Sequence, residues 1–214
     1  MDNSGKLQVL IPRNLCEFEH EINIHVNNEG LSPVEISWDQ GFVSNIQSFK
    51  EENKLINNVL FPRFVESHAH FDKSFSWMNY PNLKSDYENA LSVNLEEHIT
   101  RTANTVVKRA EKSLNLAIKF GYRAIRTHID TYNLQDREIW PKLFDLQKRY
   151  SDLLSLQFVS LAPIDFWGTK EGDLLAKNFN LNNGILGGVL VPPFDRSRIT
   201  KSLSDMLLLA KKYE

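Results

Sequence analysis

The chain has 214 residues, a formal net charge of −2 and 42% hydrophobic residues, as expected for a soluble globular protein with one or two cores. Near-balanced charge without a basic stripe argues against nucleic acid as a partner, and no apolar run approaches the roughly 20 residues of a membrane span. Cys16 is the only cysteine. Without an internal disulfide or a secretory signal, we expect a cytoplasmic location.

Residues 1–58 are predicted to form an N-terminal β-sandwich segment. Short runs rich in Val, Ile and Phe alternate there with Asn, Gly, Pro and Ser, which is typical of short strands and tight turns. The runs are LQVLIP (7–12), EINIHV (21–26), PVEISW (33–38) and GFVSNIQSF (41–49).

From about residue 59 the pattern changes to alternating strands and helices. A strand at about 59–67 precedes a long helix, for which Asn94 is the predicted cap and Gly121 the predicted stop. Apolar residues recur in this helix at three- and four-residue spacing, which indicates one buried stripe. The stripe consists of Ile99, Ala103, Val106, Ala110, Leu114 and Ala117.

The remaining elements continue the alternation. Strands are expected at 122–130, 154–163 and 184–191, and helices at 137–150, 171–179 and 195–214, the last capped by Asp195. Such alternation means a parallel sheet with helices packed outside, either doubly wound or closed as a barrel. About four βα units in residues 59–214 make half of an eight-stranded TIM-like barrel, which normally takes about 250 residues.

Two histidines follow the first of these strands. His68 and His70 are one residue apart, so an extended backbone points both rings the same way. Neutral imidazole is a good ligand for zinc, iron and related ions. The pair either binds one divalent metal ion or consists of two solvent-facing histidines in a loop.

The motif FPRFVESHAHFDKSF resembles the first-strand signature of the amidohydrolase superfamily, and its Phe-Asp-Lys narrows the resemblance to the cytosine deaminase branch. GYRAIRTHID is similar to the second strand of that branch, and LQFVSLAP and ILGGVLVPP resemble its third and fourth strands. A small β-sandwich beside the barrel is also typical of the superfamily. The resemblance covers nearly the whole chain and implies the first half of an amidohydrolase barrel over residues 59–214.

The resemblance implies a metal-dependent hydrolase of C–N bonds in cyclic amidines. His68 and His70 would bind a single divalent ion, Zn²⁺ or Fe²⁺, and the reaction would be the hydrolytic deamination of a cytosine-like ring with release of ammonia. A small heterocyclic compound would be the substrate. Asp72 and Lys73 either pair and brace the loop or act directly in the reaction.

The second strand supplies three further candidates by the same resemblance. Arg126, His128 and Asp130 would lie beside the metal, where they either line the substrate pocket and orient the ligands or form a buried polar network that holds the strand. Ile164 stands where the family has a glutamine that holds the pyrimidine, and Arg63 stands where it has a glycine.

The resemblance places no catalytic base in this chain. In the family a fifth strand carries a third metal-binding histidine and a proton-shuttling glutamate, and the sequence stops before such a strand. Four parallel strands would also leave an unpaired edge and an exposed interior. We therefore expect a truncated or split deaminase whose barrel is closed by a missing C-terminal half or a second copy.

Two alternatives remain open. One is a non-catalytic remnant or binding module of the same fold. The other is an amidohydrolase that acts on another ring amide, a lactam or a triazine, because the glutamine position holds Ile164.

Overall fold

A computed structural model describes residues 3–15, 25–48, 56–131, 138–190 and 192–214. The chain divides into two compact units, Met1–Pro62 and Arg63–Glu214. Residues near the predicted boundary belong to the first unit because they pair with its first strand. The N–H of Leu10 donates to the carbonyl of Asn58 at 2.9 Å, and the N–H of Leu60 donates to the carbonyl of Leu10 at 2.8 Å.

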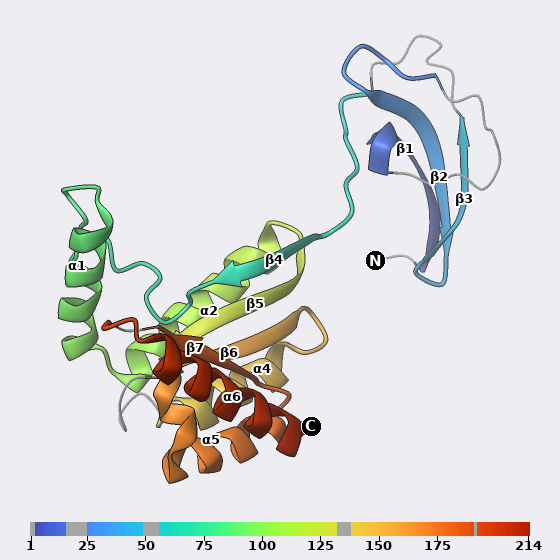
Figure 1. Cartoon of the computed structure of the whole chain (residues 1–214). Helices are drawn as coiled ribbons and strands as arrows, with labels where there is room; N and C mark the ends of the chain where they lie inside the picture. Colours follow the sequence, from blue (N-terminus) through green and yellow to red (C-terminus); the bar gives the residue numbers. More distant parts are fainter. Residues whose placement is uncertain (1–2, 16–24, 49–55, 132–137, 191) are drawn as a thin grey trace. The chain divides into compact units, whose positions relative to one another are not determined.

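The first unit is a three-stranded antiparallel sheet in the order β1-β2-β3 (Figure 1). The strands are β1 (Ser4–Pro12), β2 (Leu31–Asp39) and β3 (Phe42–Ser48), with a short 3₁₀ turn η1 (Arg13–Leu15). Val9 pairs with Val34 in the register of β1 and β2, and both are buried with Ile11 and Ile36 in a small apolar core. Most of the predicted strand at 21–26 lies outside the described residues, and its last two residues are not in a strand.

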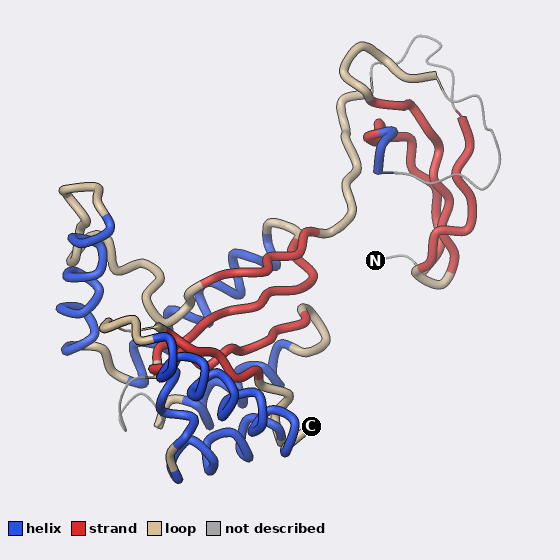
Figure 2. Tube along the Cα trace, in the orientation of Figure 1, coloured by secondary structure: helices blue, strands red, loops and turns tan. Residues whose placement is uncertain are grey.

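The second unit is a four-stranded parallel sheet in the order β4-β5-β6-β7 (Figures 1 and 2). Its strands are β4 (Phe64–Ala69), β5 (Tyr122–Asp130), β6 (Ser155–Pro163) and β7 (Ile185–Val189). The helices that connect or follow these strands are α1 (Tyr87–Thr100), α2 (Ala103–Lys119), α4 (Trp140–Tyr150), α5 (Lys170–Asn180) and α6 (Arg196–Lys212), with a 3₁₀ helix η2 (Ile164–Gly168) after β6. Sequential parallel strands with intervening helices confirm the predicted α/β class.

The core of this unit lies between the sheet and the helices. Alternate residues of β5 and β6 are buried against the helices, among them Ile125, Ile129 and Phe158. Four residues of the predicted apolar stripe lie in α2 and are buried, namely Val106, Ala110, Leu114 and Ala117. The residues of β7 are half-buried or exposed. The reason is its place at the edge, where it pairs with β6 alone among the described strands.

The long helix predicted from Asn94 to Gly121 is two helices in the structure. The break has a local cause, since Thr102 takes an extended conformation and its side chain accepts a hydrogen bond from the N–H of Thr105, which caps α2. Asp86 caps α1 in the same way through the N–H of Asn89.

Two residues were consequently misassigned. Ile99, predicted in the buried stripe, is 83% exposed at the end of α1. Asn94 lies inside α1 and accepts a hydrogen bond from Arg101, so it does not cap a helix. The cap predicted at Asp195 is confirmed, because its side chain accepts from the N–H of Arg198. In the described part of the chain, no helix combines the length and apolar character needed to cross a membrane.

Candidate functional site

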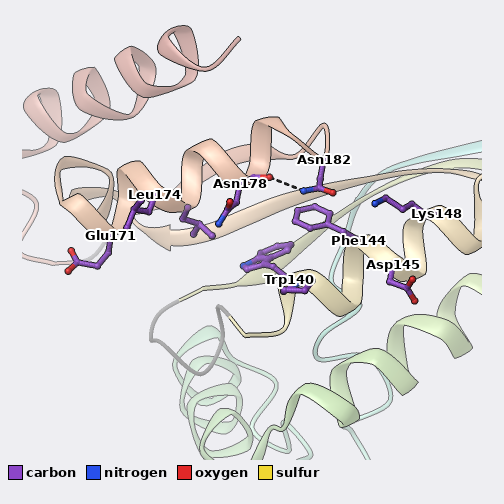
Figure 3. A pocket seen from close by; sticks show the side chains of 10 residues that line it. Trp140, Phe144, Asp145, Lys148, Glu171, Leu174, Asn178 and Asn182 are labelled. Atoms are coloured by element: carbon purple, nitrogen blue, oxygen red, sulfur yellow. Dashed lines mark hydrogen bonds between the residues drawn. The ribbon is translucent and has the colours of Figure 1, made fainter.

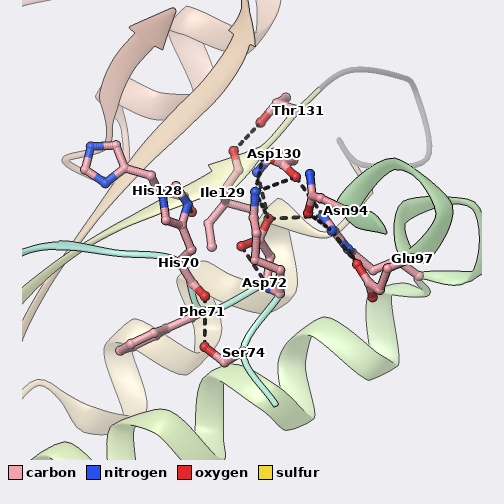
Figure 4. A network of polar contacts seen from close by, with 12 residues as sticks. His70, Phe71, Asp72, Ser74, Asn94, Glu97, His128, Ile129, Asp130 and Thr131 are labelled. Atoms are coloured by element: carbon pink, nitrogen blue, oxygen red, sulfur yellow. Dashed lines mark hydrogen bonds and ion pairs between the residues drawn. The ribbon is translucent and has the colours of Figure 1, made fainter. Parts of the chain in front are cut away.

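The carboxyl ends of the four parallel strands lie at one edge of the second sheet. His70 follows β4 directly, and His128 and Asp130 end β5. Figure 4 shows these side chains beside the loop that follows β4. The carboxylate of Glu66 accepts the N–H of His68 at 2.9 Å, which helps to set the backbone between the two histidines.

His68 and His70 turn the same nitrogen atoms toward each other. Their Nε2 atoms are 3.2 Å apart. Two nitrogens that each bind a tetrahedral zinc ion at about 2.0–2.1 Å lie about 3.3–3.4 Å apart, so the separation fits two ligands of one ion. It equally fits a hydrogen bond between the two rings. The Nδ1 of His70 faces the carbonyl of His128 at 3.2 Å, which leaves Nε2 as the ligand atom.

His128 does not join this pair as a third ligand. Its ring stacks on that of His68, with centroids 4.0 Å apart and an interplanar angle of 27°. Within the described ranges, no group of three or more His, Cys, Asp or Glu residues is arranged to hold a metal ion. The residues present therefore fit a metal ion only in part, because a catalytic zinc site usually has three protein ligands and an open position.

The pKa values of His70 and His128 are both lowered, which favours the neutral form of the imidazole that can bind a metal ion. Burial, followed by the charges of Lys73 and His68, lowers the pKa of His70 to about 4. Burial, followed by His68, also lowers the pKa of His128. Both rings are neutral at pH 7, so each keeps a nitrogen lone pair.

Two aspartates and a lysine join the loop after β4 to the end of β5. The Nζ of Lys73 lies 2.7 and 2.8 Å from the two carboxylate oxygens of Asp130 and 3.9 Å from Asp72. Asp72 accepts the N–H of Asp130 at 3.0 Å. Both aspartates are buried. These contacts brace the loop, with Lys73 paired mainly to Asp130.

The pKa values of the two aspartates are shifted in opposite directions. The pKa of Asp72 is raised to about 6, chiefly by burial and also by the charge of Asp130, although Lys73 and Arg101 oppose the rise. Burial also raises the pKa of Asp130, but Lys73 and Arg101 outweigh it, so the pKa falls below its usual range. Asp72 therefore takes up a proton at a higher pH than Asp130 does.

Sequence reasoning missed the centre of this network, which is Arg101. Its side chain is 2% exposed and contacts Asp72 at 3.1 Å and Asp130 at 3.0 Å. It also binds Glu97, which in turn binds Arg109 at 2.6 Å. A signal was present, since Glu97 and Arg101 are four residues apart on one helix face.

The other two predicted pocket residues lie apart from this network. Arg126 is exposed and its Nε donates to Gln157 on β6 at 3.0 Å. Strand alternation places it on the same face as His128. Ile164 begins η2 and is only 8% exposed, and its side chain lies against the backbone of Gly188.

A groove of about 610 Å³ lies between α4 and α5 (Figure 3). Trp140, Phe144 and Leu175 form its apolar floor, and Asp145 and Lys148 are among its polar lining residues. None of the predicted site residues lines it, so it is separate from the strand-end site.

No family model matches the chain. Among curated proteins it is 28% identical over 147 residues to a pterin deaminase of Rhizobium rhizogenes, which covers 65% of this chain and 34% of the relative. It is 23% identical over 209 residues to an N-isopropylammelide isopropyl amidohydrolase of a Pseudomonas species, covering 91% of this chain and 52% of the relative. The structure of 5-methylcytosine deaminase from Klebsiella pneumoniae with phosphonocytosine superposes with a TM-score of 0.68 at 17% identity, covering 98% of this chain and 49% of that chain.

A small antiparallel sheet followed by parallel βα units defines an α/β protein that matches about half of the amidohydrolase structures. In sequence and in fold the chain is similar to these deaminases and amidohydrolases, as the resemblance drawn from its strand motifs predicted. It spans about half of the length of these relatives or less.

Proposed function

We propose that this chain carries the metal-holding part of a hydrolase that removes an amine from a cyclic amidine, in the manner of a cytosine deaminase. One observation carries the proposal. The Nε2 atoms of His68 and His70 converge to 3.2 Å at the carboxyl end of a strand that begins a run of parallel βα units. Chemistry in such folds gathers at this edge of the sheet.

The relatives support this reaction class. Their names specify a deaminase of pterin, a deaminase of 5-methylcytosine and an amidohydrolase of N-isopropylammelide. All three names describe loss of an amine from a nitrogen heterocycle. A ring with an exocyclic amino group is accordingly the proposed substrate class.

Each residue at the strand ends has a proposed part. His68 and His70 would hold one divalent ion, Zn²⁺ or Fe²⁺, and that ion would supply a water activated for attack near neutral pH. His128 packs flat against His68 and restricts that ring. Asp72, Lys73 and Asp130 hold the loop that carries His70, and Arg126 faces the substrate side of the sheet. We propose that residues outside these 214 supply the remaining ligands and the proton-transferring base.

A triazine substrate is the second candidate. The relative that covers 91% of this chain is named for N-isopropylammelide. Ile164, in the position where a glutamine would hold a pyrimidine, has an apolar side chain that cannot donate a hydrogen bond. A triazine ring that is bound without a hydrogen bond from a glutamine side chain would be compatible with Ile164 at this position.

The test is ammonia or amine release by the chain produced together with the polypeptide encoded directly downstream. The substrates are cytosine, 5-methylcytosine, pterin and N-isopropylammelide, each assayed with Zn²⁺ and with Fe²⁺. We expect release from at least one ring, and its loss in His68→Ala and in His70→Ala.

His25→Ala is the matched control, because His25 is an exposed histidine of the first unit and its removal should leave the rate unchanged. No release from any ring by a folded, metal-loaded protein would contradict the proposal and favour a non-catalytic binding module.

A further inference from the structure

We propose that Arg101 is a positioning residue, which joins α1 to the ends of β4 and β5 and thereby holds His70 where it can bind a metal ion. The metal part of this inference rests on the function proposed above. The guanidinium lies among three carboxylates, those of Asp72, Glu97 and Asp130.

The two aspartates that Arg101 contacts lie close in sequence to the two histidines, so the position of Arg101 affects the position of the histidines. Asp72 is two residues after His70, and Asp130 is two residues after His128. One nitrogen of Arg101, Nη1, donates to both aspartates, at 3.1 and 3.0 Å. The guanidinium therefore ties together the two backbone segments that carry the two histidines.

The segment between His70 and Asp72 is held on both sides. The N–H of Phe71 donates to Oγ1 of Thr127 at 3.0 Å, and the hydroxyl of Ser74 donates to the carbonyl of His70 at 2.8 Å. These bonds make a short, rigid path from Asp72 to the imidazole of His70. A shift of Asp72 would consequently move the ring.

Arg101 also provides the main attachment of α1. Glu97 is the one buried residue of that helix, whereas its apolar side chains Leu91 and Leu95 are 45% and 49% exposed. Apolar packing therefore contributes little to the position of α1. The ion pairs of Arg101 and Glu97 set it instead.

Only an arginine can make all of these contacts. Its Nε and Nη2 atoms donate to Glu97 while Nη1 donates to the two aspartates. A lysine presents the same charge as a single ammonium group without the planar fork. Together with Lys73 and Arg109, three cations balance three carboxylates, so Arg101→Lys keeps the net charge of the cluster while it removes the geometry.

The test compares Arg101→Lys with the whole, unmodified chain by amide hydrogen exchange and by Co²⁺ binding followed in its visible spectrum. In the variant we expect the amides of Phe71 and Asp130 to exchange about tenfold or more faster, and the amide of Leu143 in the apolar core to be unchanged. We expect Co²⁺ affinity to fall about 10- to 100-fold, as is typical when a residue that supports metal ligands is lost.

Arg149→Lys is the matched control, since Arg149 also binds two carboxylates but is 49% exposed on α4, and both readings should stay as in the unmodified chain. Asp72→Asn is the second variant and should reproduce the faster exchange at Asp130.

Unchanged exchange in Arg101→Lys, or equal acceleration at Leu143, would overturn the positioning role. An unmodified chain that binds no Co²⁺ would overturn the proposed function and the metal part of this inference, and the exchange data would still decide whether Arg101 positions the loop.

Discussion

The two faces of the four-stranded sheet are built from the same strands but serve different purposes. On the helix-covered face, Ile125 and Phe158 are at most 4% exposed. On the opposite face their sequence neighbours Arg126 and Gln157 are exposed and bond to each other. The difference indicates that one face stabilises the fold, whereas the other face and the strand ends hold the polar residues to which we assign the proposed chemistry.

The largest expected effect comes from the helix-covered face. Phe158→Ala removes a fully buried ring that packs edge-on against Trp140 and Phe144, and it should lower the free energy of unfolding by about 3–5 kcal/mol. Urea denaturation followed by tryptophan fluorescence measures this. Gln157→Ala, one residue away on the other face, should change it by less than about 0.5 kcal/mol. Equal losses would remove the distinction between the faces.

A smaller effect should come from the hydroxyl that links the helix-covered face to the loop after β4. Thr127→Val keeps the shape of a fully buried side chain but leaves the N–H of Phe71 without its acceptor. We expect a loss of about 1–3 kcal/mol in the free energy of unfolding. Hydrogen exchange should show the greatest change at Phe71. A stabilised protein with slower exchange there would contradict the assignment of this bond.

The cap between the two helices should have a modest effect. Thr102→Ala removes the side chain that accepts from the N–H of Thr105 at the start of α2, and should cost about 1 kcal/mol. Thr102→Ser keeps the cap and serves as the control. If both variants unfold at the same urea concentration, then the break between α1 and α2 has another cause.

The smallest effect is expected at the exposed surface of the helical layer. Asp173 accepts hydrogen bonds from Lys212 and Tyr213, which hold its pKa below the usual 3.8. Its contribution to stability is present above pH 3.8 and is lost as the pH falls through the lowered pKa. Asp173→Asn should therefore lower the free energy of unfolding only slightly at pH 7 and not at all in strong acid. At pH 7 the loss should be smaller in 1 M salt than at low salt. If Asp173→Asn lowered the free energy of unfolding as much as Phe158→Ala does, the predicted ranking of the variants would be contradicted.

Much of the fold could be predicted from sequence, because its strands are apolar and its helices periodic. The strand at 122–130 and the cap at Asp195 were predicted directly. The break at Thr102 was missed because the apolar spacing continues across it, and only hydrogen bonding distinguishes one helix from two. An unpaired edge was predicted from the four parallel strands, but the partial exposure of β7 was not, because an apolar strand has the same sequence pattern at an edge and in the centre of a sheet.

The candidate site could be predicted only where its residues lie close in sequence. His68 and His70 share one short motif, so their convergence followed from strand alternation. Arg101 is 29 residues from each of its two aspartates, and such pairing depends on tertiary structure. The hydrogen bond between Arg126 and Gln157 likewise joins residues that are far apart in sequence, so local sequence patterns could not predict it.

The central claim, that His68 and His70 share one divalent ion, is tested most directly by metal analysis of the purified chain after exposure to Zn²⁺ and to Fe²⁺. The account predicts one bound ion per chain, nitrogen ligands at about 2.0–2.1 Å by X-ray absorption for zinc, and loss of the ion in the double variant His68→Ala/His70→Ala with retention in His25→Ala. An unmodified chain that holds no ion, or a double variant that holds it as firmly, would contradict the account.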